Sequence, residues 1–456
     1  MNKHDLFTTF RQQLTSLTLQ NGGDFHIALS GGLDSIVLLH LFSRLRERDK
    51  KIAVFAHHIN HGLSENAQCW SDFCADYCRH LQVGFTLTKV QLNKKNRISL
   101  EALAREKRYH ALQKNLSEQS CLVTAHHQDD QLETVLLALK RGSGITGLQG
   151  IQGRQTLSSG FLIRPLLVFS RAQLEEYASL FQLQWIEDES NSNQDFDRNF
   201  IRHSITPLLK GRWPSIGKSV ARSAFICQEQ QQILDELAAQ DHAAVLYSCL
   251  NQQALTVSGL KLLSVGRRNN VLRLWFKLQQ IDYPSATQMQ AIWQNVVLAK
   301  NDATPIMQFK NYSLRRYRDH IYLLKDQDIA INRSEKIYWQ GQSLLSLAND
   351  RIQLQLAFSE QCEAADMVIN CPKDAQIEIC FRSHLPTNLR CQPTGRQGSR
   401  SIKKLLHEYH VAPWLRDLVP FILVNGELAA AVGLWQCQIT NESSEIGQLH
   451  IKLLND

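Results

Sequence analysis

One stretch of the sequence constrains the fold more than any other, Ser30-Gly31-Gly32-Leu33-Asp34-Ser35. It lies between an apolar run at 25–29 and a segment at 36–42 that has the apolar pattern of a helix. A strand, a loop of small residues and a helix in this order form a phosphate cradle, because the loop N–H groups and the positive end of the helix dipole point at one place. The two glycines let the backbone approach phosphate oxygens, and the two serine hydroxyls add donors. Asp34 would repel a bare phosphate, so we expect it to act through Mg²⁺.

The loop differs from a Walker A sequence, which needs G-x-x-x-x-G-K-[ST]. An ordinary strand-to-helix turn is the alternative, since glycine and serine are common in such turns. The segments that follow favour the phosphate-binding interpretation, because further polar residues come directly after other predicted strands.

Strand-like and helical segments alternate through the first part of the chain. Strand patterns at 51–57, 85–90 and 121–125 alternate with helical patterns at 67–81, 101–116 and 131–140, and Ser99 is the expected N-cap of the helix at 101–116. This alternation predicts an α/β fold with a doubly wound parallel sheet. Ligands of such sheets bind at the carboxyl ends of the strands.

The pattern changes after residue 215. A long helical stretch at 219–247, helices near 268–279 and 287–299, and a hairpin pattern at 306–324 predict a mostly helical second domain. Short strand-like runs follow from about residue 336, with one helix at 401–409, and indicate a small α+β domain. We therefore predict three domains, at 1–215, 216–335 and 336–456.

Composition narrows the class of protein. The chain has 456 residues, of which 43% are hydrophobic and 20% charged, as in ordinary globular proteins. The N-terminal residues lack the layout of a signal peptide, and no apolar run is long enough to cross a bilayer. The 11 cysteines are odd in number and form no C-x-x-C, which favours reduced thiols. We expect a cytoplasmic protein without a membrane partner.

The distribution of positive charge is uneven. Six Lys or Arg and no acidic residue lie between Arg198 and Arg222, and the same holds between Ile379 and His407. Either stretch alone is typical of a solvated basic face. The two together, in a chain with a phosphate-binding loop, predict a divided surface for a polyanion and favour a nucleic acid.

A second candidate site follows the predicted strand at 121–125. Asp130 and Glu133 are three residues apart at the start of a helix and share one face, with His126 just before them. Helix N-capping is an alternative role for these acids, above all for Asp129. A zinc site is another alternative, but H-E-x-x-H is absent and carboxylates suit Mg²⁺ better. An acidic pocket for an amine is the third.

Several segments, in the same order along the chain, resemble the tRNA(Ile)-lysidine synthetase family of the N-type ATP pyrophosphatases. The resemblance covers the loop at 30–35 and the segments 58–63, 101–109, 125–134, 141–148, 163–167, 187–191 and 198–202, and it is looser at 396–406 and 413–416. It implies an adenine nucleotide alpha hydrolase-like N-terminal domain and the two further domains predicted above.

The resemblance also implies a reaction and a set of residues. The family uses ATP to adenylate the wobble cytidine of the CAU anticodon of tRNA(Ile), and free lysine then displaces AMP to give lysidine. The implied ATP-binding residues are the loop at 30–35, with Asp34 also holding Mg²⁺, and Asp130 and Glu133 match the motif for the lysine amine. The other implied catalytic residues are His126, Arg105, Arg108 and Arg198, and the expected tRNA-binding residues are Arg202, Arg212, Arg396, Arg400, Lys403 and Lys404.

Two other functions stay open at this point. A tRNA thiolase with the same type of loop would also adenylate a carbonyl of the tRNA. Such enzymes usually need a pair of cysteines, and this chain contains no C-x-x-C. A non-catalytic tRNA-binding protein would not need to keep Asp34, Asp130 and Glu133. A homodimer is also left open.

Overall fold

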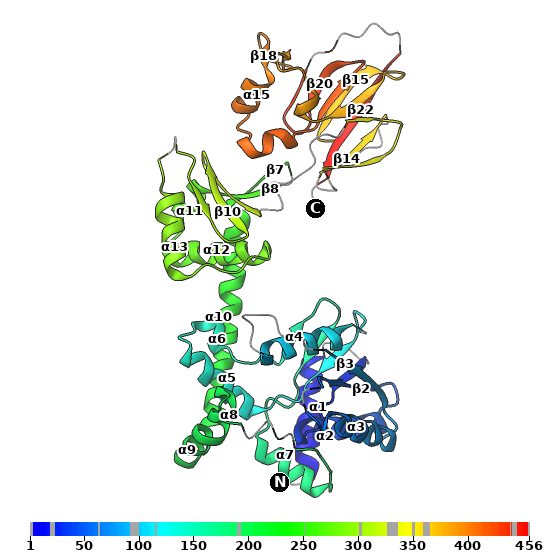
Figure 1. Cartoon of the computed structure of the whole chain (residues 1–456), viewed down its shortest axis with the longest axis vertical. Helices are drawn as coiled ribbons and strands as arrows, with labels where there is room; N and C mark the ends of the chain where they lie inside the picture. Colours follow the sequence, from blue (N-terminus) through cyan, green and yellow to red (C-terminus); the bar gives the residue numbers. More distant parts are fainter. Residues whose placement is uncertain are drawn as a thin grey trace. The chain divides into compact units, whose positions relative to one another are not determined.

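The structure is a computed structural model that divides into two compact units, Met1–Ile233 and Leu234–Asp456, which are described separately (Figure 1). It describes residues 3–18, 23–62, 64–91, 100–114, 116–187, 189, 193–250, 252–300, 303–325, 336–348, 352–358, 365–437, 439 and 445–454. The expected N-cap Ser99 lies outside these residues, as do parts of the motif segments at 58–63 and 187–191.

The first unit contains a six-stranded sheet in the order β3-β2-β1-β4-β6-β5. Its strands are β1 Asp24–Ala28, β2 Ala53–Asn60, β3 Gly84–Lys89, β4 Cys121–Val123, β5 Arg154–Thr156 and β6 Phe161–Ile163. All pairings are parallel except that of the edge strand β5. The strand order reverses between β1 and β4, and ligands of doubly wound sheets bind outside such a reversal point. The predicted doubly wound sheet is confirmed.

Helices cover both faces of this sheet. The helices that pack on it are α1 Lys3–Leu17, α2 Leu33–Arg48, α3 Ala67–His80, α4 Leu100–Gln113 and α7 Arg171–Leu180. Two further helices of this unit, α5 Gln128–Lys140 and α6 Ile145–Leu148, follow β4. Cys121 and Val123 of β4 join the main core with α1, α2, α3 and α7, whereas Leu122 packs with Leu112 of α4 on the opposite face. Alternate side chains of a strand point to opposite faces, so a three-residue strand serves two cores.

A continuous basic helical segment follows the sheet. It consists of α8 Asp197–Phe200, the π-helical turn η2 Ile201–Ile205 and α9 Thr206–Arg212. The segment ends at Trp213, whose N–H still donates to Leu209 O, and α10 Ile216–Val245 begins three residues later. The bounds of α10 include the division between the two units at residues 233 and 234.

The second unit begins with helices packed on a five-stranded sheet in the order β7-β8-β11-β10-β9. The elements are β7 Leu246–Cys249, β8 Gln252–Thr256, α11 Val257–Leu262, α12 Val265–Leu278, α13 Ala286–Ile292, η3 Trp293–Val297, β9 Ile306–Gln308, β10 Tyr312–Tyr317 and β11 His320–Lys325. Trp275 and Phe276 of α12 are fully buried in its core. The predicted hairpin is confirmed, but the sequence patterns did not predict β7 and β8, which extend its sheet.

The rest of the second unit is rich in strands. Its elements are β12 Lys336–Tyr338, β13 Leu344–Leu347, β14 Ile352–Ala357, β15 Met367–Pro372, β16 Ile377–Cys380, η4 Arg382–His384, β17 Arg390–Cys391, β18 Arg400–Ser401, α15 Ile402–Glu408, η5 Pro413–Leu418, β19 Phe421–Val424, β20 Glu427–Ala431, β21 Trp435–Gln436 and β22 Ile446–Leu454. The sheet β12-β16-β19-β20-β21 and the sheet β13-β14-β22-β15 share one hydrophobic core. The predicted helix at 401–409 is confirmed as α15.

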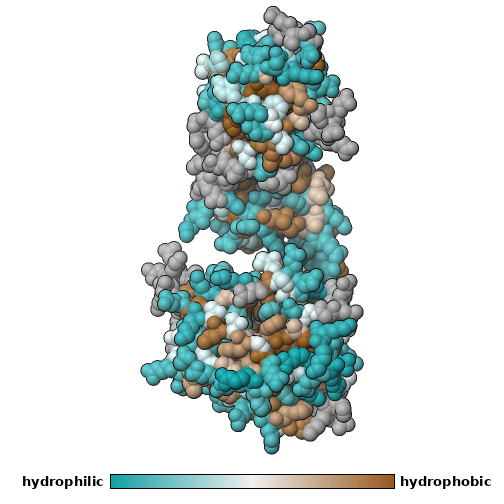
Figure 2. Space-filling model, turned by 90° about the vertical axis from the view of Figure 1, so that its right-hand side faces the viewer, coloured by the Kyte–Doolittle hydropathy of each residue, from teal (hydrophilic) through white to brown (hydrophobic). Residues whose placement is uncertain are grey.

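A hydrophobic cluster joins the two parts of the second unit. Tyr322 of β11 and Leu405 of α15 belong to it, and the Tyr322 ring meets Trp414 edge-on with centroids 5.2 Å apart. The boundaries at 215 and 335 therefore stay a prediction. On the face that Figure 2 displays, hydrophobic residues form patches with hydrophilic residues around them. Among the described residues, no helix combines the length and the apolar character needed to cross a bilayer.

Candidate active site

The loop at 30–35 connects β1 to α2 and is held closed by Ser35. The Ser35 hydroxyl accepts from the N–H of Gly31 at 3.1 Å and donates to Gly32 O at 2.9 Å. Gly31 has φ +88°, and a Cβ there would lie 2.8 Å from Cδ1 of Ile186, so only glycine fits this position. Gly32 precedes the first turn of α2 and provides no side-chain cap, and Leu33 is buried and offers only its backbone. This arrangement suits an anion at the start of α2.

Asp34 lies on the first turn of α2 and has one satisfied and one unsatisfied oxygen. Its Oδ2 accepts from Arg171 Nη1 at 2.6 Å and lies 3.6 Å from His127 Nε2. Its Oδ1 is buried and has no hydrogen-bond partner. A buried carboxylate oxygen without a partner is costly unless a donor or cation arrives.

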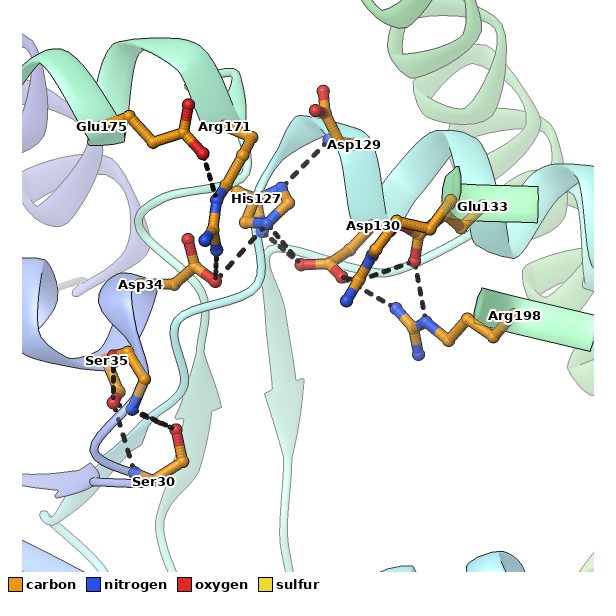
Figure 3. Close-up of polar contacts among 12 residues, drawn as sticks. Ser30, Asp34, Ser35, His127, Asp129, Asp130, Glu133, Arg171, Glu175 and Arg198 are labelled. Atoms are coloured by element: carbon orange, nitrogen blue, oxygen red, sulfur yellow. Dashed lines mark hydrogen bonds and ion pairs between the residues drawn. The ribbon is translucent and has the colours of Figure 1, made fainter. Parts of the chain in front are cut away.

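Arg171 is a residue of the site that no sequence pattern indicated. It is the first residue of α7, lies 137 positions from Asp34 in the chain, and also donates to Glu175 Oε1 at 3.0 Å (Figure 3). No local pattern marks it, because only the packing of α7 beside α2 brings the two residues together.

His127 connects the loop to the acidic helix α5 (Figure 3). It is the N-cap of α5: its Nδ1 accepts from the N–H of Asp129 at 3.2 Å, and its own N–H donates to Asp130 Oδ2 at 2.9 Å. Its Nε2 therefore carries the ring proton and lies 3.5 Å from Asp130 Oδ2 as well as 3.6 Å from Asp34 Oδ2. Burial opposes charge on this ring, but the Asp34 hydrogen bond and the nearby carboxylates outweigh burial and raise the pKa of His127.

The sequence pattern had indicated the neighbouring histidine, His126. Its Nδ1 is 2.9 Å from Thr124 Oγ1, and the ring is half-buried. Burial lowers the pKa of His126 to about 3, with Asp130 opposing and the charges of Arg164 and Arg198 adding to this effect. A neutral imidazole results at ordinary pH. The role of His126 toward a phosphate or base remains a prediction, whereas His127 is the ring that stands between the carboxylates.

Asp130 and Glu133 share one face of α5, and two arginines occupy that face. Arg198 donates to Glu133 Oε2 at 2.8 Å and to Asp130 Oδ1 at 2.9 Å. Arg202 donates to Glu133 Oε1 at 2.7 Å and to Asp130 Oδ1 at 3.1 Å. Glu133 is 1% exposed, so its charge depends on these partners.

This network shifts two pKa values. Burial would raise the pKa of Asp130, but His127, Arg198 and the His127 N–H bond outweigh burial and lower it to about 2. Burial likewise disfavours charge on Arg202, but its hydrogen bond to Glu133 and the charges of Glu133 and Asp130 raise its pKa above the ordinary value. Both groups are therefore charged throughout the physiological range.

Asp129 points away from this pair. Its Oδ2 accepts from Lys210 Nζ of α9 at 2.5 Å, and its Oδ1 is buried without a hydrogen-bond partner. Both Asp129 and Asp130 lie in the first turn of α5, as the capping and dipole interpretation predicts, but only the Asp130 carboxylate accepts from the N-cap N–H. Lys210 is a further residue of the site. Sequence patterns indicated it only as one of the six cations between Arg198 and Arg222.

Arg105 and Arg108 lie on α4, away from the carboxylates. Both are exposed; Arg108 Nε is 3.3 Å from His61 Nε2, and Arg105 lies over the Tyr109 ring at 5.1 Å. The Arg105 charge contributes to the low pKa of His126, which places it within electrostatic reach of that ring. Their catalytic roles remain predictions.

The predicted tRNA-binding residues have different environments. Arg202 belongs to the acidic network, whereas Arg212 is exposed at the end of α9. Lys403 and Lys404 are exposed on α15, and Arg400 is half-buried in β18. Arg396 pairs with Glu408 at 2.7 Å, so an acid just beyond the basic stretch neutralises part of its charge.

The predicted Mg²⁺ agrees with the donors present. The unpartnered Oδ1 of Asp34 beside a phosphate cradle offers the single carboxylate that a phosphate-bound Mg²⁺ needs. Within the part of the chain that the structure describes, no group of three or more His, Cys, Asp or Glu side chains could hold a metal ion. The zinc alternative therefore has no support among these residues.

Comparisons with family models divide the chain into three matched regions. A PP-loop domain matches residues 6–209, a TilS substrate binding domain matches residues 255–322, and a TilS substrate C-terminal domain matches residues 377–453. Among solved structures, the chain is similar to the U34-tRNA thiolase from Methanococcus maripaludis, with 16% identity and a TM-score of 0.40 over 49% of this chain and 79% of that chain.

Curated relatives match along nearly the whole sequence. A tRNA(Ile)-lysidine synthase from Photobacterium profundum is 39% identical over 94% of this chain and 96% of its own length. One from Pectobacterium atrosepticum is 41% identical over 90% of both chains. One from Haemophilus influenzae is 38% identical over 95% of this chain and 99% of its own. At this identity and coverage, the chain belongs to the tRNA(Ile)-lysidine synthase family.

Proposed function

We propose that this chain uses ATP to join free L-lysine to C2 of the wobble cytidine in the CAU anticodon of tRNA(Ile). The cytidine O2 attacks the α-phosphorus of ATP, and the bond to pyrophosphate breaks. The lysine ε-amine then attacks C2 and loses a proton, and AMP leaves with O2. One observation carries the proposal beyond family membership: Nε2 of His127 lies 3.6 Å from Asp34 of the loop and 3.5 Å from Asp130 of the acidic helix. His127 therefore connects the part of the site proposed to bind ATP with the part proposed to bind lysine.

The phosphate half of the site consists of the loop and Arg171. The N–H groups at the start of α2 are free of side-chain caps and can donate to phosphate oxygens. Arg171 holds Asp34 Oδ2 and adds positive charge where pyrophosphate charge develops. Asp34 Oδ1 would hold the Mg²⁺, which neutralises phosphate charge when it is bound.

The lysine half of the site consists of Asp130 and Glu133. A carboxylate with a pKa of about 2 is too weak a base to take the proton of an ammonium, so Asp130 suits the holding of charge rather than proton transfer. Arg198 and Arg202 already neutralise these carboxylates. An incoming ammonium must therefore compete with a guanidinium, and an arginine displaced in this way can turn to a phosphate.

The test is a reaction of the full chain with ATP, labelled lysine and an unmodified tRNA(Ile) with a CAU anticodon. We expect label to enter the tRNA with one AMP released for each lysine. A tRNA with uridine at the wobble position is the control and should take up none. AMP release that needs a sulfur donor instead of lysine would establish the thiolase alternative, and tRNA binding without AMP release would establish a non-catalytic role.

Contacts with the rest of the tRNA are also proposed. The exposed cations of α15 are expected to contact tRNA phosphates outside the anticodon, because a single nucleoside needs no such surface. The cytoplasmic location and the homodimer remain predictions.

A further inference from the structure

A hollow lies at the elbow between α9 and α10. Its volume is about 350 Å³, and it is lined by Trp213, Ser215, Ile216 and Ser219. Trp213 is 54% exposed, which is unusual for a residue of this size. Its backbone is fixed on both sides, because its N–H donates to Leu209 O and its carbonyl accepts from Ile216 N–H at 3.0 Å. The elbow therefore presents a large aromatic ring from a rigid backbone.

This elbow packs against the helix that carries the acidic pair. A Cβ on Gly217 would lie 3.0 Å from Oε1 of Gln128, the first residue of α5. Lys210, three residues before the elbow, holds Asp129 on the same first turn of α5. The elbow therefore belongs to the first unit, and its start and end both contact the first turn of the helix that carries the carboxylates.

The charges around the elbow are positive and unbalanced. Arg212, Lys218 and Arg222 are exposed or half-exposed, and none forms an ion pair with a residue that the structure describes. The other cations of this stretch are already bound to the carboxylates of α5. Free cations beside an exposed aromatic ring bind a phosphate backbone together with a base that stacks on the ring.

We propose that this hollow receives a nucleobase that has turned out of the anticodon loop next to the modified cytidine, stacked on Trp213. The proposal rests on the proposed function, because it takes tRNA as the ligand. A flat base fits a hollow between a ring and the start of a helix, and the hydroxyls of Ser215 and Ser219 can meet polar groups on its edge. The free arginines and lysine would hold the phosphates on either side of it.

The main experiment places 2-aminopurine at each anticodon-loop position of the RNA in turn and measures its fluorescence with the full chain. We expect binding of the unsubstituted chain to quench the probe strongly at one position other than the wobble base. Trp213→Ala should abolish that quenching and weaken RNA binding about tenfold, whereas Trp213→Phe should retain most of both. Phe225→Ala, which removes an exposed ring of α10 outside the hollow, is the matched control and should change neither.

Two further measurements separate stacking from other roles. Ser219→Phe would fill the hollow while leaving Trp213 in place, and it should also abolish the quenching. Trp213→Ala should leave the slope of log affinity against log salt unchanged, whereas Arg212→Ala should lower it by about 0.7.

The proposal is overturned if no probe position depends on Trp213, or if Trp213→Ala raises the KM for ATP and leaves RNA binding intact. The second result would assign the hollow to the base of ATP. Because RNA binding is measured without ATP or lysine, a failure of lysidine formation would be seen separately.

Discussion

Two stretches of this chain share a sequence signature but form different structures. Each contains six cations and no acid, at 198–222 and at 382–404. In the first, Arg198, Arg202 and Lys210 turn inward to the buried carboxylates of α5. In the second, Arg396 and Arg382 pair with the partly exposed Glu408 and Asp417, and the lysines of α15 face solvent. Charge composition therefore indicates that anions are near, but burial decides whether they belong to the protein or to a ligand.

The largest expected effect distinguishes the two stretches by stability. Glu133→Gln leaves two guanidiniums facing a weaker partner in a buried network, so we expect a loss of about 3 kcal/mol in the free energy of unfolding. Glu408→Gln, which removes the partner of Arg396 at the surface, should cost less than about 1 kcal/mol. Urea unfolding of both variants is the measurement. Equal losses would mean that the buried ion pairs of the first stretch contribute no more to stability than the surface ion pairs of the second.

The next effect concerns the carboxylates that the first stretch binds, and which substrate they hold. Asp130→Asn removes one charge from the proposed ammonium site, so the KM for lysine should rise more than the KM for ATP. The expected loss is roughly 2–4 kcal/mol of transition-state stabilisation. Steady-state kinetics with each substrate varied is the measurement, with Glu408→Gln as the control for a carboxylate removed elsewhere. Equal losses for lysine and ATP would instead indicate a metal-binding or structural role for Asp130.

A smaller effect is expected from the second stretch. Replacing Arg400, Lys403 and Lys404 by Ala should weaken tRNA binding and lower its log–log salt slope by about 0.7–0.9 for each phosphate that the protein no longer neutralises. The KM values for ATP and lysine should hardly change. Because Arg396 already pairs with Glu408, adding Arg396→Ala should change the slope little further. Filter binding across a salt series checks this, and an unchanged affinity would show that the stretch is only a solvated face.

The smallest effect is a pH dependence inside the first unit. His126 has a pKa of about 3 in the folded state, so between pH 6.5 and about 3 only the unfolded state takes up its proton. Proton uptake by the unfolded state favours unfolding, so the free energy of unfolding is unaffected well above pH 6.5 and decreases as the pH falls through 6.5. This loss should reach about 0.8 kcal/mol between pH 7.5 and pH 6. The measurement is the free energy of unfolding at both pH values. In His126→Asn, the difference between the two pH values should be smaller by this amount. The same pH-dependent difference in both proteins would show that His126 titrates normally.

The sheet of the first unit could be predicted because its signal is local. Apolar runs of strand length alternate with helical patterns, and β1, β2, β3 and β4 appear where those runs stand. The loop at 30–35 and the acids of α5 could be predicted for the same reason, since each follows directly after a strand. In the second unit, β7 and β8 could not be predicted, because Leu246 and Tyr247 directly continue the helical pattern of α10.

The interactions inside the site depend on packing and gave no local signal. Arg171 reaches Asp34 across 137 positions, and Lys210 reaches Asp129 across 81. The choice between His126 and His127 depends on which ring caps α5, and adjacent residues on an extended segment point in opposite directions. Sequence patterns placed the carboxylates in the site but could not show that arginines of the same chain already bind them.

The π-helical turn at 201–205 makes the function of the basic segment depend on its exact number of residues. A π turn holds one more residue than an α turn, and such turns often mark an insertion at a functional site. Arg198 and Arg202 lie before or within it, and Lys210 and Trp213 lie after it. Removal of one residue from this turn would rotate everything downstream by about 100° relative to the arginines. Deletion of a single residue here would therefore turn Lys210 away from Asp129 and change the direction of Trp213. No single substitution in the segment can have this effect.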